Sequence, residues 1–183
     1  MKTNTDAQYK EQFDLAQSIF ESKLGDYNAS FLWYRPSSLT DKLFIKANRI
    51  RSLQIQKEQL VEGKGNSIKD EFQGILNYAI CSLMQLEIGN TIIPESVSKE
   101  KILASFKKYR QAILELMQKK NHDYGEAWRQ MRIPSITDEI LVKIIRIRQM
   151  ESNGSGSSEG IDQNYMDIAN YALFALILIE ENK

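Results

Sequence analysis

Two segments of the chain place a lysine and an arginine one helical turn apart among apolar residues. Lys143 and Arg146 lie in residues 138–150, which are otherwise rich in Ile, Leu and Val, and Lys46 and Arg49 repeat the spacing in the first half. A helix that is apolar on most sides is expected to be buried, and a cation on it must reach water, a carboxylate or an anionic ligand. We therefore interpret these cations either as a phosphate clamp or as partners of internal acids.

Polar residues recur every three positions on a second apolar segment, residues 161–179. Asn164, Asp167 and Asn170 should lie along one side of a helix, and buried polar groups need partners. Asp167 is a candidate partner for the nearby cations or for a divalent metal ion. The aligned residue in the first half is Gly74. Because Asp167 has no carboxylate twin, we expect the second half to dominate any single active site.

An Asp-Tyr pair occurs at the same place in both halves, as Asp26-Tyr27 and Asp123-Tyr124. The carboxylate can accept hydrogen bonds from a sugar or from an arginine, and the tyrosine can stack on a base or fill the core. The single histidine, His122, precedes one of these pairs and is expected to lie on a surface turn.

These observations define the candidate site residues. The candidate catalytic groups are Asp167 and Asp123, and Asp167 and Glu139 are the candidate ligands for a metal ion. The candidate ligand-binding residues are Lys143, Arg146, Tyr124, Asn170 and Arg132 in the second half, and Lys46, Arg49, Asp26, Tyr27 and Asn77 in the first.

The chain contains an internal repeat that relates these residues. Residues 26–53 align without a gap with residues 123–150, and ten of the 28 positions are identical. Residues 68–87 match residues 161–180 in a second block. Most identities are polar, charged or tyrosine, whereas core packing alone would keep mainly apolar character. We predict two helical repeats, residues 1–90 and 91–183, related by a pseudo-twofold axis and packed as one compact domain.

The elements expected to position the site are helices. Apolar periodicity predicts helices near residues 7–23, 39–57, 69–87, 98–119, 137–151 and 162–181, and no alternation is long enough for a strand. The fold class is therefore all-α, a helical bundle. Ser38 and Asp41, like Ser135 and Asp138, have the spacing of a capping box, which predicts helix starts there. Residues 62–67 and 154–160 are expected to be loops, the second of them mobile.

Composition excludes several classes of function. Equal numbers of basic and acidic residues, 24 of each, provide no overall field to attract nucleic acid or an anionic membrane. The single cysteine, Cys81, cannot form an intramolecular disulfide and is expected in the core. No secretory signal is visible, and the apolar run at residues 169–179 is too short to span a membrane. We therefore expect a cytoplasmic protein.

Three stretches carry a resemblance to a known family. They are Asn-His-Asp-Tyr-Gly-Glu-Ala-Trp-Arg at 121–129, Ser-Ile-Thr-Asp-Glu-Ile at 135–140, and Asp-Ile-Ala-Asn-Tyr-Ala-Leu-Phe-Ala-Leu at 167–176. Together they resemble the nucleotide modification associated domain 1 family of bacteria and phages, whose domain typically occurs as two copies. The resemblance implies a link to nucleotide or modified-base metabolism and supplies no reaction.

A weaker resemblance connects the chain to the MazG-like all-α nucleoside triphosphate pyrophosphatases. That family holds Mg²⁺ with two acidic motifs, and residues 164–167 look like the second motif with its glutamate replaced by Asn164. In the first motif Lys143 follows Glu139 at the next turn, where the family has a carboxylate. This departure reverses the local charge and favours direct neutralisation of phosphate by the cations.

Three hypotheses follow from the sequence. The first is a protein that binds a nucleotide or deoxynucleotide and modifies or hydrolyses it, or only binds it. The second is a degenerate MazG-like pyrophosphatase that depends on Mg²⁺. The third is a non-catalytic helical interaction module, in which every charge is paired internally. A homodimer is compatible with each of them.

Overall fold

The computed structural model describes residues 4–56, 66–90, 93–153 and 160–182. Within these ranges the chain forms six α-helices, three short 3-10 helices and no strand, which confirms the all-α prediction. The elements are α1 (Thr5–Tyr27), η1 (Ser30–Trp33), α2 (Pro36–Gln56), α3 (Ile68–Ile88), η2 (Pro94–Ser96), α4 (Lys99–Tyr124), η3 (Ala127–Gln130), α5 (Ile133–Ser152) and α6 (Ile161–Glu181). Residues 62–65 and 154–159 of the two predicted loops lie outside the described ranges.

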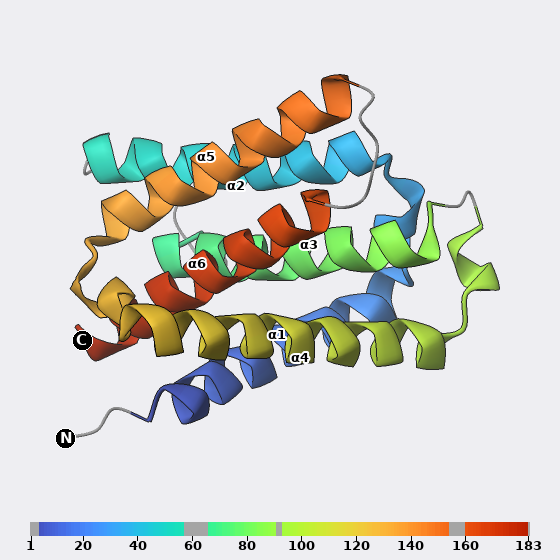
Figure 1. The fold of residues 1–183 in the computed structure, drawn as a ribbon. Coiled ribbons are helices and arrows are strands. Elements are labelled where there is room, and N and C mark those ends of the chain that lie inside the picture. Colours follow the sequence, from blue (N-terminus) through green and yellow to red (C-terminus); the bar gives the residue numbers. More distant parts are fainter. Residues whose placement is uncertain (1–3, 57–65, 91–92, 154–159, 183) are drawn as a thin grey trace.

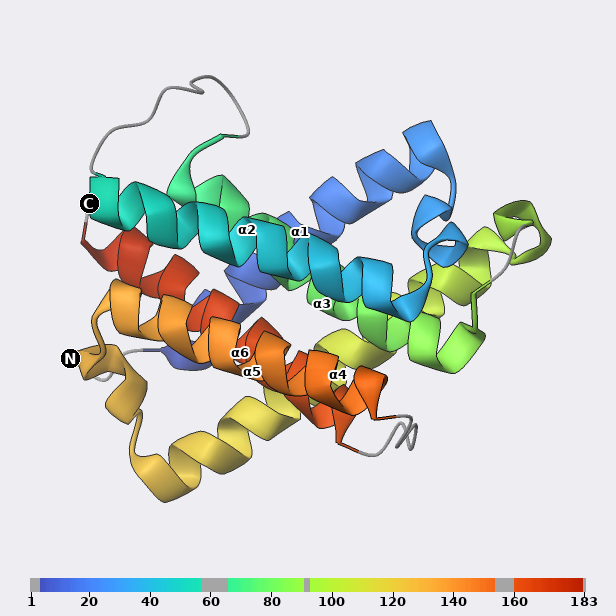
Figure 2. The same cartoon turned by 90° about the horizontal axis from the view of Figure 1, so that it is seen from above.

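The order of elements repeats along the chain and in space. The series α1, η1, α2, α3 is followed by α4, η3, α5, α6, as the repeat in the sequence predicts. Figure 1 shows three layers, with α2 and α5 on one side, α3 and α6 in the middle, and α1 and α4 on the other side. The view from above shows α2 and α5 running side by side (Figure 2).

Ion pairs between α2 and α5 locate the pseudo-twofold axis. Asp41 contacts Arg148 at 2.5 Å, and Arg51 contacts Asp138 at 3.9 Å. Asp41 is equivalent to Asp138 in the repeat, and Arg51 is equivalent to Arg148. The same interaction is therefore made twice in opposite directions, which is the pattern that a twofold axis imposes.

Both helices at the axis begin earlier than the capping boxes predicted. α2 starts at Pro36 and α5 at Ile133, which is followed by Pro134. Proline favours the first turn of a helix because its φ is already fixed near the helical value. Ser38 and Ser135 consequently lie within the helices, so the prediction that these serines begin the helices is wrong. Asp41 and Asp138, three residues further along, make the ion pairs across the axis.

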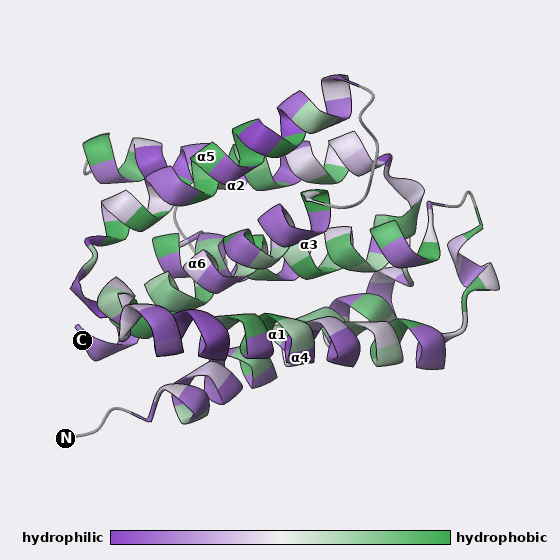
Figure 3. Ribbon diagram, in the orientation of Figure 1, coloured by the Kyte–Doolittle hydropathy of each residue, from purple (hydrophilic) through white to green (hydrophobic). Residues whose placement is uncertain are grey.

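The hydrophobic core extends through both repeats. The buried apolar side chains form one continuous cluster, to which α3 and α6 contribute the most residues. Hydrophilic residues cover much of the outer face of α4, while apolar residues follow α3 (Figure 3). Among the described helices, none combines the length and the apolar character that crossing a membrane requires.

Candidate functional site

The predicted cations of the first repeat meet a buried acid. Glu71 on α3 is only 4% exposed, and its Oε2 lies 3.0 Å from the Nζ of Lys46. Arg49 pairs with the other oxygen of the same carboxylate and also donates a hydrogen bond to the main-chain oxygen of Asn66 at 3.2 Å. A buried carboxylate needs such partners because ionised groups are costly to remove from water. In this repeat the internal-acid interpretation therefore accounts for both cations.

The second repeat uses an acid one helical turn further along. Asp167 accepts a hydrogen bond from Lys143 at 2.8 Å and also pairs with Lys120 of α4. Arg146 is exposed and forms no ion pair with any described residue. The position equivalent to Glu71 is Asn164, whose amide donates to the main-chain oxygen of Gly160 at 2.5 Å.

Each repeat thus has three cations at equivalent positions and one acid to neutralise them. The equivalent cations are Lys23 and Lys120, Lys46 and Lys143, and Arg49 and Arg146. In each repeat the acid engages two of the three. Among the described residues, the cation left without an ion pair is Lys23 in the first repeat and Arg146 in the second.

A cavity of about 400 Å³ lies in the first repeat, between α1, η1 and α3. Lys23 lines it, and no acidic side chain does among the described residues. Its aromatic lining consists of Phe20, Tyr27, Phe31, Tyr34 and Tyr78. A concave, largely apolar space with a few polar groups is the usual form of a small-molecule site. We refer to this space as the first-repeat pocket.

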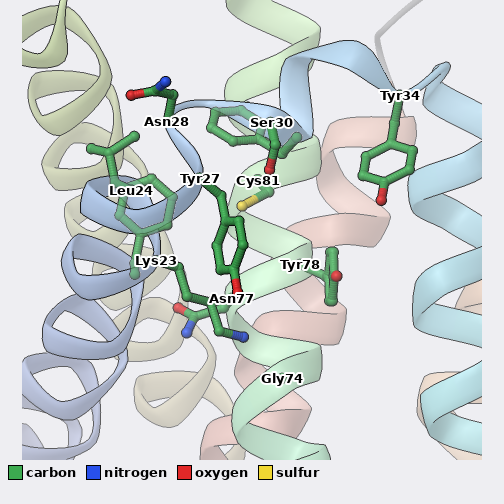
Figure 4. Close-up of a pocket in the computed structure, with 12 residues that line it drawn as sticks. Lys23, Leu24, Tyr27, Asn28, Ser30, Tyr34, Gly74, Asn77, Tyr78 and Cys81 are labelled. Atoms are coloured by element: carbon green, nitrogen blue, oxygen red, sulfur yellow. The ribbon is translucent and has the colours of Figure 1, made fainter. Parts of the chain in front are cut away.

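The first-repeat pocket has its lysine and amide at one end and two of its tyrosines on the other side. Figure 4 shows Lys23, Tyr27 and Asn77 gathered at one end, above Gly74. Tyr34 and Tyr78 stand on the other side of the space. The pocket therefore presents a cationic end and an aromatic side to a ligand.

A second ammonium group, that of Lys46, lies behind Gly74 at the border of the cationic end. A Cβ built on Gly74 would lie 2.8 Å from the Cε of Lys46 and 2.9 Å from its Nζ. Lys46 therefore lies directly against this glycine, which itself lines the pocket. Any side chain at position 74 would have to displace the end of Lys46.

Asn77 provides an unused acceptor beside these cations. Its Oδ1 is buried and has no hydrogen-bond partner among the described residues. The equivalent Asn170 accepts a hydrogen bond from the hydroxyl of Tyr9 at 2.9 Å and donates one to the main-chain oxygen of Ile113 at 3.4 Å. The residue equivalent to Tyr9 is Phe106, which has no hydroxyl to donate. A buried acceptor without a partner is rare and suits a ligand that carries a donor.

Burial keeps two titratable groups of the pocket neutral. Desolvation raises the pKa of Cys81 to about 12 and raises the pKa of Tyr78 above its usual value of 10. Cys81 is therefore a thiol at neutral pH, as its expected place in the core implies, and it lacks the thiolate that a nucleophile needs. Tyr78 keeps its proton and can donate a hydrogen bond.

Larger side chains occupy the equivalent positions of the second repeat. Trp128 and Phe174 replace Phe31 and Cys81, and their rings stack with centroids 4.3 Å apart and planes 10° from parallel. The indole nitrogen of Trp128 donates to the side chain of Asn121 at 3.1 Å. The position of Gly74 is taken by the Asp167 carboxylate with its two lysines. These groups fill the positions that border the pocket in the first repeat.

The remaining predicted residues are dispersed. Asp26, Asp123, Tyr124 and Arg132 are exposed, and Asp123 contacts the ring of His122 at 3.1 Å on the surface. No group of three or more His, Cys, Asp or Glu side chains that could hold a metal ion forms within the described residues. The proposed metal ligand Asp167 instead faces two ammonium groups, whose charge opposes a cation there.

Sequence reasoning found part of the first-repeat pocket and missed the rest. Tyr27 and Asn77 line it and Lys46 borders it, whereas Lys23, Tyr34 and Tyr78 were not proposed. A signal for it was present in the repeat, because the first half has Gly and Cys where the second has Asp and Phe. Two such reductions in size on one helix face indicate a space that the other repeat fills.

Comparison with known proteins identifies the family of both repeats. The model of the nucleotide modification associated domain 1 family matches residues 23–86 and 120–179, one segment in each repeat. Neither the curated proteins nor the solved structures contain a match to the chain.

Proposed function

We propose, from the premise that this chain belongs to the nucleotide modification associated domain 1 family, that it binds a nucleotide in the first-repeat pocket. The observation that carries this proposal is the combination of an unpaired lysine, an unused buried acceptor and several tyrosines around one cavity. The family name supplies the link to nucleotides, and the pocket supplies the groups that a nucleotide needs.

The tyrosines suit the base. Tyr27 is 69% exposed at the rim, and Tyr34 and Tyr78 stand across the cavity from it. An aromatic ring offers a flat face on which any base can stack, for roughly 1–3 kcal/mol per base. The Oδ1 of Asn77 accepts a hydrogen bond from a base amino group or a sugar hydroxyl.

The cationic end suits the phosphate. Lys23 has no acid to neutralise it among the described residues, and Lys46 shares Glu71 with Arg49. An ammonium group is a common phosphate ligand because it donates in several directions as a point charge. In this proposal Lys46 and Arg49 act as a pair anchored by Glu71, with Lys46 closer to the ligand.

The MazG-like alternative requires a bound metal ion, and the described carboxylates are poorly placed to bind one. Asp167 is occupied by Lys120 and Lys143, so Mg²⁺ would have to displace two ammonium groups. Asp123 and Asp167 stay predictions as catalytic groups. Release of pyrophosphate from a nucleoside triphosphate that depends on Mg²⁺ and disappears in Asp167→Ala would establish the alternative.

A matched pair of substitutions tests the proposal. Tyr27 and Tyr124 are equivalent in the repeat and similarly exposed, at 69% and 73%, but only Tyr27 lines the first-repeat pocket. Calorimetric titration with a panel of deoxynucleotides should give binding that Tyr27→Ala weakens by about tenfold, the loss of one stacking contact. Tyr124→Ala should leave the affinity within about twofold of the wild type.

Two outcomes would contradict this. A larger loss in Tyr124→Ala than in Tyr27→Ala would place the ligand in the second repeat, where the sequence alone suggested it. An absence of heat for every nucleotide, with a second method such as equilibrium dialysis also negative, would remove nucleotide binding and leave the helical interaction module.

A further inference from the structure

We infer that the preferred ligand of the first-repeat pocket is a nucleoside monophosphate rather than a triphosphate or a free nucleoside. This inference rests on the proposed function and adds the number of phosphates to it. Three features carry it: the net charge at the cationic end, the volume of the cavity, and the uncharged character of the rest of its lining.

The charge at the cationic end matches one phosphate group. Lys46, Arg49 and Glu71 together carry one net positive charge at neutral pH, and Lys23 adds a second. A terminal phosphate monoester carries about −1.5 to −2 charges at pH 7. One such group therefore neutralises the cationic end almost completely.

The rest of the lining provides no charge for further phosphates. Lys23 is the one charged side chain among the described residues that line the cavity. The nearby Lys42 lies over the ring of Tyr34, with its Nζ 5.5 Å from the ring centroid, and so belongs to the aromatic side. A second and a third phosphate would extend past Lys23 and Lys46. Their charges would have no cationic partner in the lining, and they would lose hydration on binding.

The volume of the cavity also favours a nucleoside monophosphate. A cavity of about 400 Å³ is close to the lower limit of the range of roughly 300–1,000 Å³ that is usual for ligand sites. A nucleoside with one phosphate uses both the aromatic side and the cationic end of such a space. A free nucleoside would leave Lys23 without a counter-charge, and the added phosphates of a triphosphate would find no further cation in the described lining.

Calorimetry on the full chain tests the inference with three ligands that share one base: the deoxynucleoside and its 5′-monophosphate and 5′-triphosphate, at low salt without divalent metal. We expect the monophosphate to bind at least tenfold more tightly than either of the others. A triphosphate that binds as tightly as the monophosphate overturns the inference and leaves the proposed function intact. A nucleoside that does so removes the phosphate contact. Absence of binding by all three, repeated with each of the four bases, removes the proposed function itself.

A second pair of variants identifies the group responsible. Lys23→Gln removes the unpaired charge from an exposed side chain, so the fold should be retained. We expect it to lower the affinity for the monophosphate about tenfold and to leave that for the nucleoside unchanged. The matched control is Lys120→Gln, which removes the equivalent lysine of the second repeat and should leave both affinities unchanged. Equal losses in the two variants would overturn the assignment to the first repeat.

Discussion

The two repeats have the same helices and the same three cationic positions, but they place their acid one turn apart. Glu71 lies next to Lys46 and Arg49, and the end of the Lys46 side chain lies against Gly74. Asp167 occupies the position equivalent to Gly74 and draws Lys120 and Lys143 onto it. A shift of a single carboxylate by three residues therefore decides which cation remains unpaired.

The aromatic residues also differ between the repeats, and this difference too leaves the first repeat open and the second closed. The second repeat stacks Trp128 on Phe174, and the first has the smaller Phe31 and Cys81 at those places. The comparison teaches that one helical framework can be a closed structural unit or an open pocket, depending on a few side chains. The following predictions test that division, from the largest expected effect to the smallest.

The largest effect should come from the stacked tryptophan. Trp128→Ala removes a buried ring that packs on Phe174 and hydrogen-bonds to Asn121, so we expect a loss of about 3–5 kcal/mol in the free energy of unfolding. Phe31→Ala should cost less, because that ring already borders a cavity and makes fewer contacts on one side. Urea unfolding measures both values, and equal losses would contradict the division between a closed and an open repeat.

Replacing the more buried acid, Glu71, should cost more stability than replacing Asp167. Glu71→Gln leaves two partly buried cations without their acid, for which we expect a loss of roughly 2–4 kcal/mol. Asp167→Asn should cost about 1–2 kcal/mol, since Asp167 is less buried and the side chain of Lys120 is 42% exposed. Both substitutions remove one negative charge, so each controls for the other in thermal or urea unfolding. A larger loss for Asp167→Asn would reverse the comparison.

Gly74→Asp would give the first repeat the acid of the second. The new carboxylate would lie against Lys46 at the cationic end of the first-repeat pocket. We expect nucleotide affinity to fall at least tenfold, about 1.4 kcal/mol, through repulsion of the phosphate. Gly74→Ala serves as the control, because it displaces the flexible end of Lys46 without adding a charge and should weaken binding less. Calorimetry that finds equal losses for the two would attribute the effect to space rather than charge.

The smallest effect concerns a pair of residues at the axis. Glu151 accepts a hydrogen bond from Thr40, and its equivalent Gln54 donates one to Thr137. Desolvation raises the pKa of Glu151, so its ionised form is less favourable in the folded protein than in the unfolded chain. Its contribution to stability is therefore present below the unfolded pKa and declines as the pH rises through the folded pKa.

Glu151→Gln should consequently raise the thermal midpoint at pH 7 by about 1–2 °C and give no gain near pH 4. Thermal unfolding followed by circular dichroism at the two pH values measures the difference. Gln54→Glu provides the reciprocal change and should lower the midpoint at pH 7. A gain that is the same at both pH values would show that ionisation is not its cause.

The helices could be predicted because their apolar periodicity is strong on α3, α5 and α6. α2 and α5 begin before the starts that the spacing of serine and aspartate predicts, because the nearby prolines already favour the helical conformation. A proline in the first turn fixes a helical φ, and Pro36 and Pro134 both precede the serines that were expected to cap the helices.

The site was harder to predict, and the reason lies in helix geometry. The alignment of Asp167 with Gly74 makes Asp167 look like the distinctive acid and favours the second repeat. Residues three apart share a helix face, so Glu71 can serve the same cations from one turn away. The contributions of Lys23 and Tyr34 depend on how α1 and η1 approach α3, which a sequence repeat does not specify.

The ion pairs at the axis have the symmetry that two identical copies of one unit would give. The two pairs are equivalent to each other by the repeat, so a protein with one copy of this unit would form both of them with a second molecule of itself. Fusion of the two copies into one chain would then have allowed each copy to change separately. The residues at the axis serve both copies at once, whereas the residues around each pocket can differ, as Gly74 and Asp167 do.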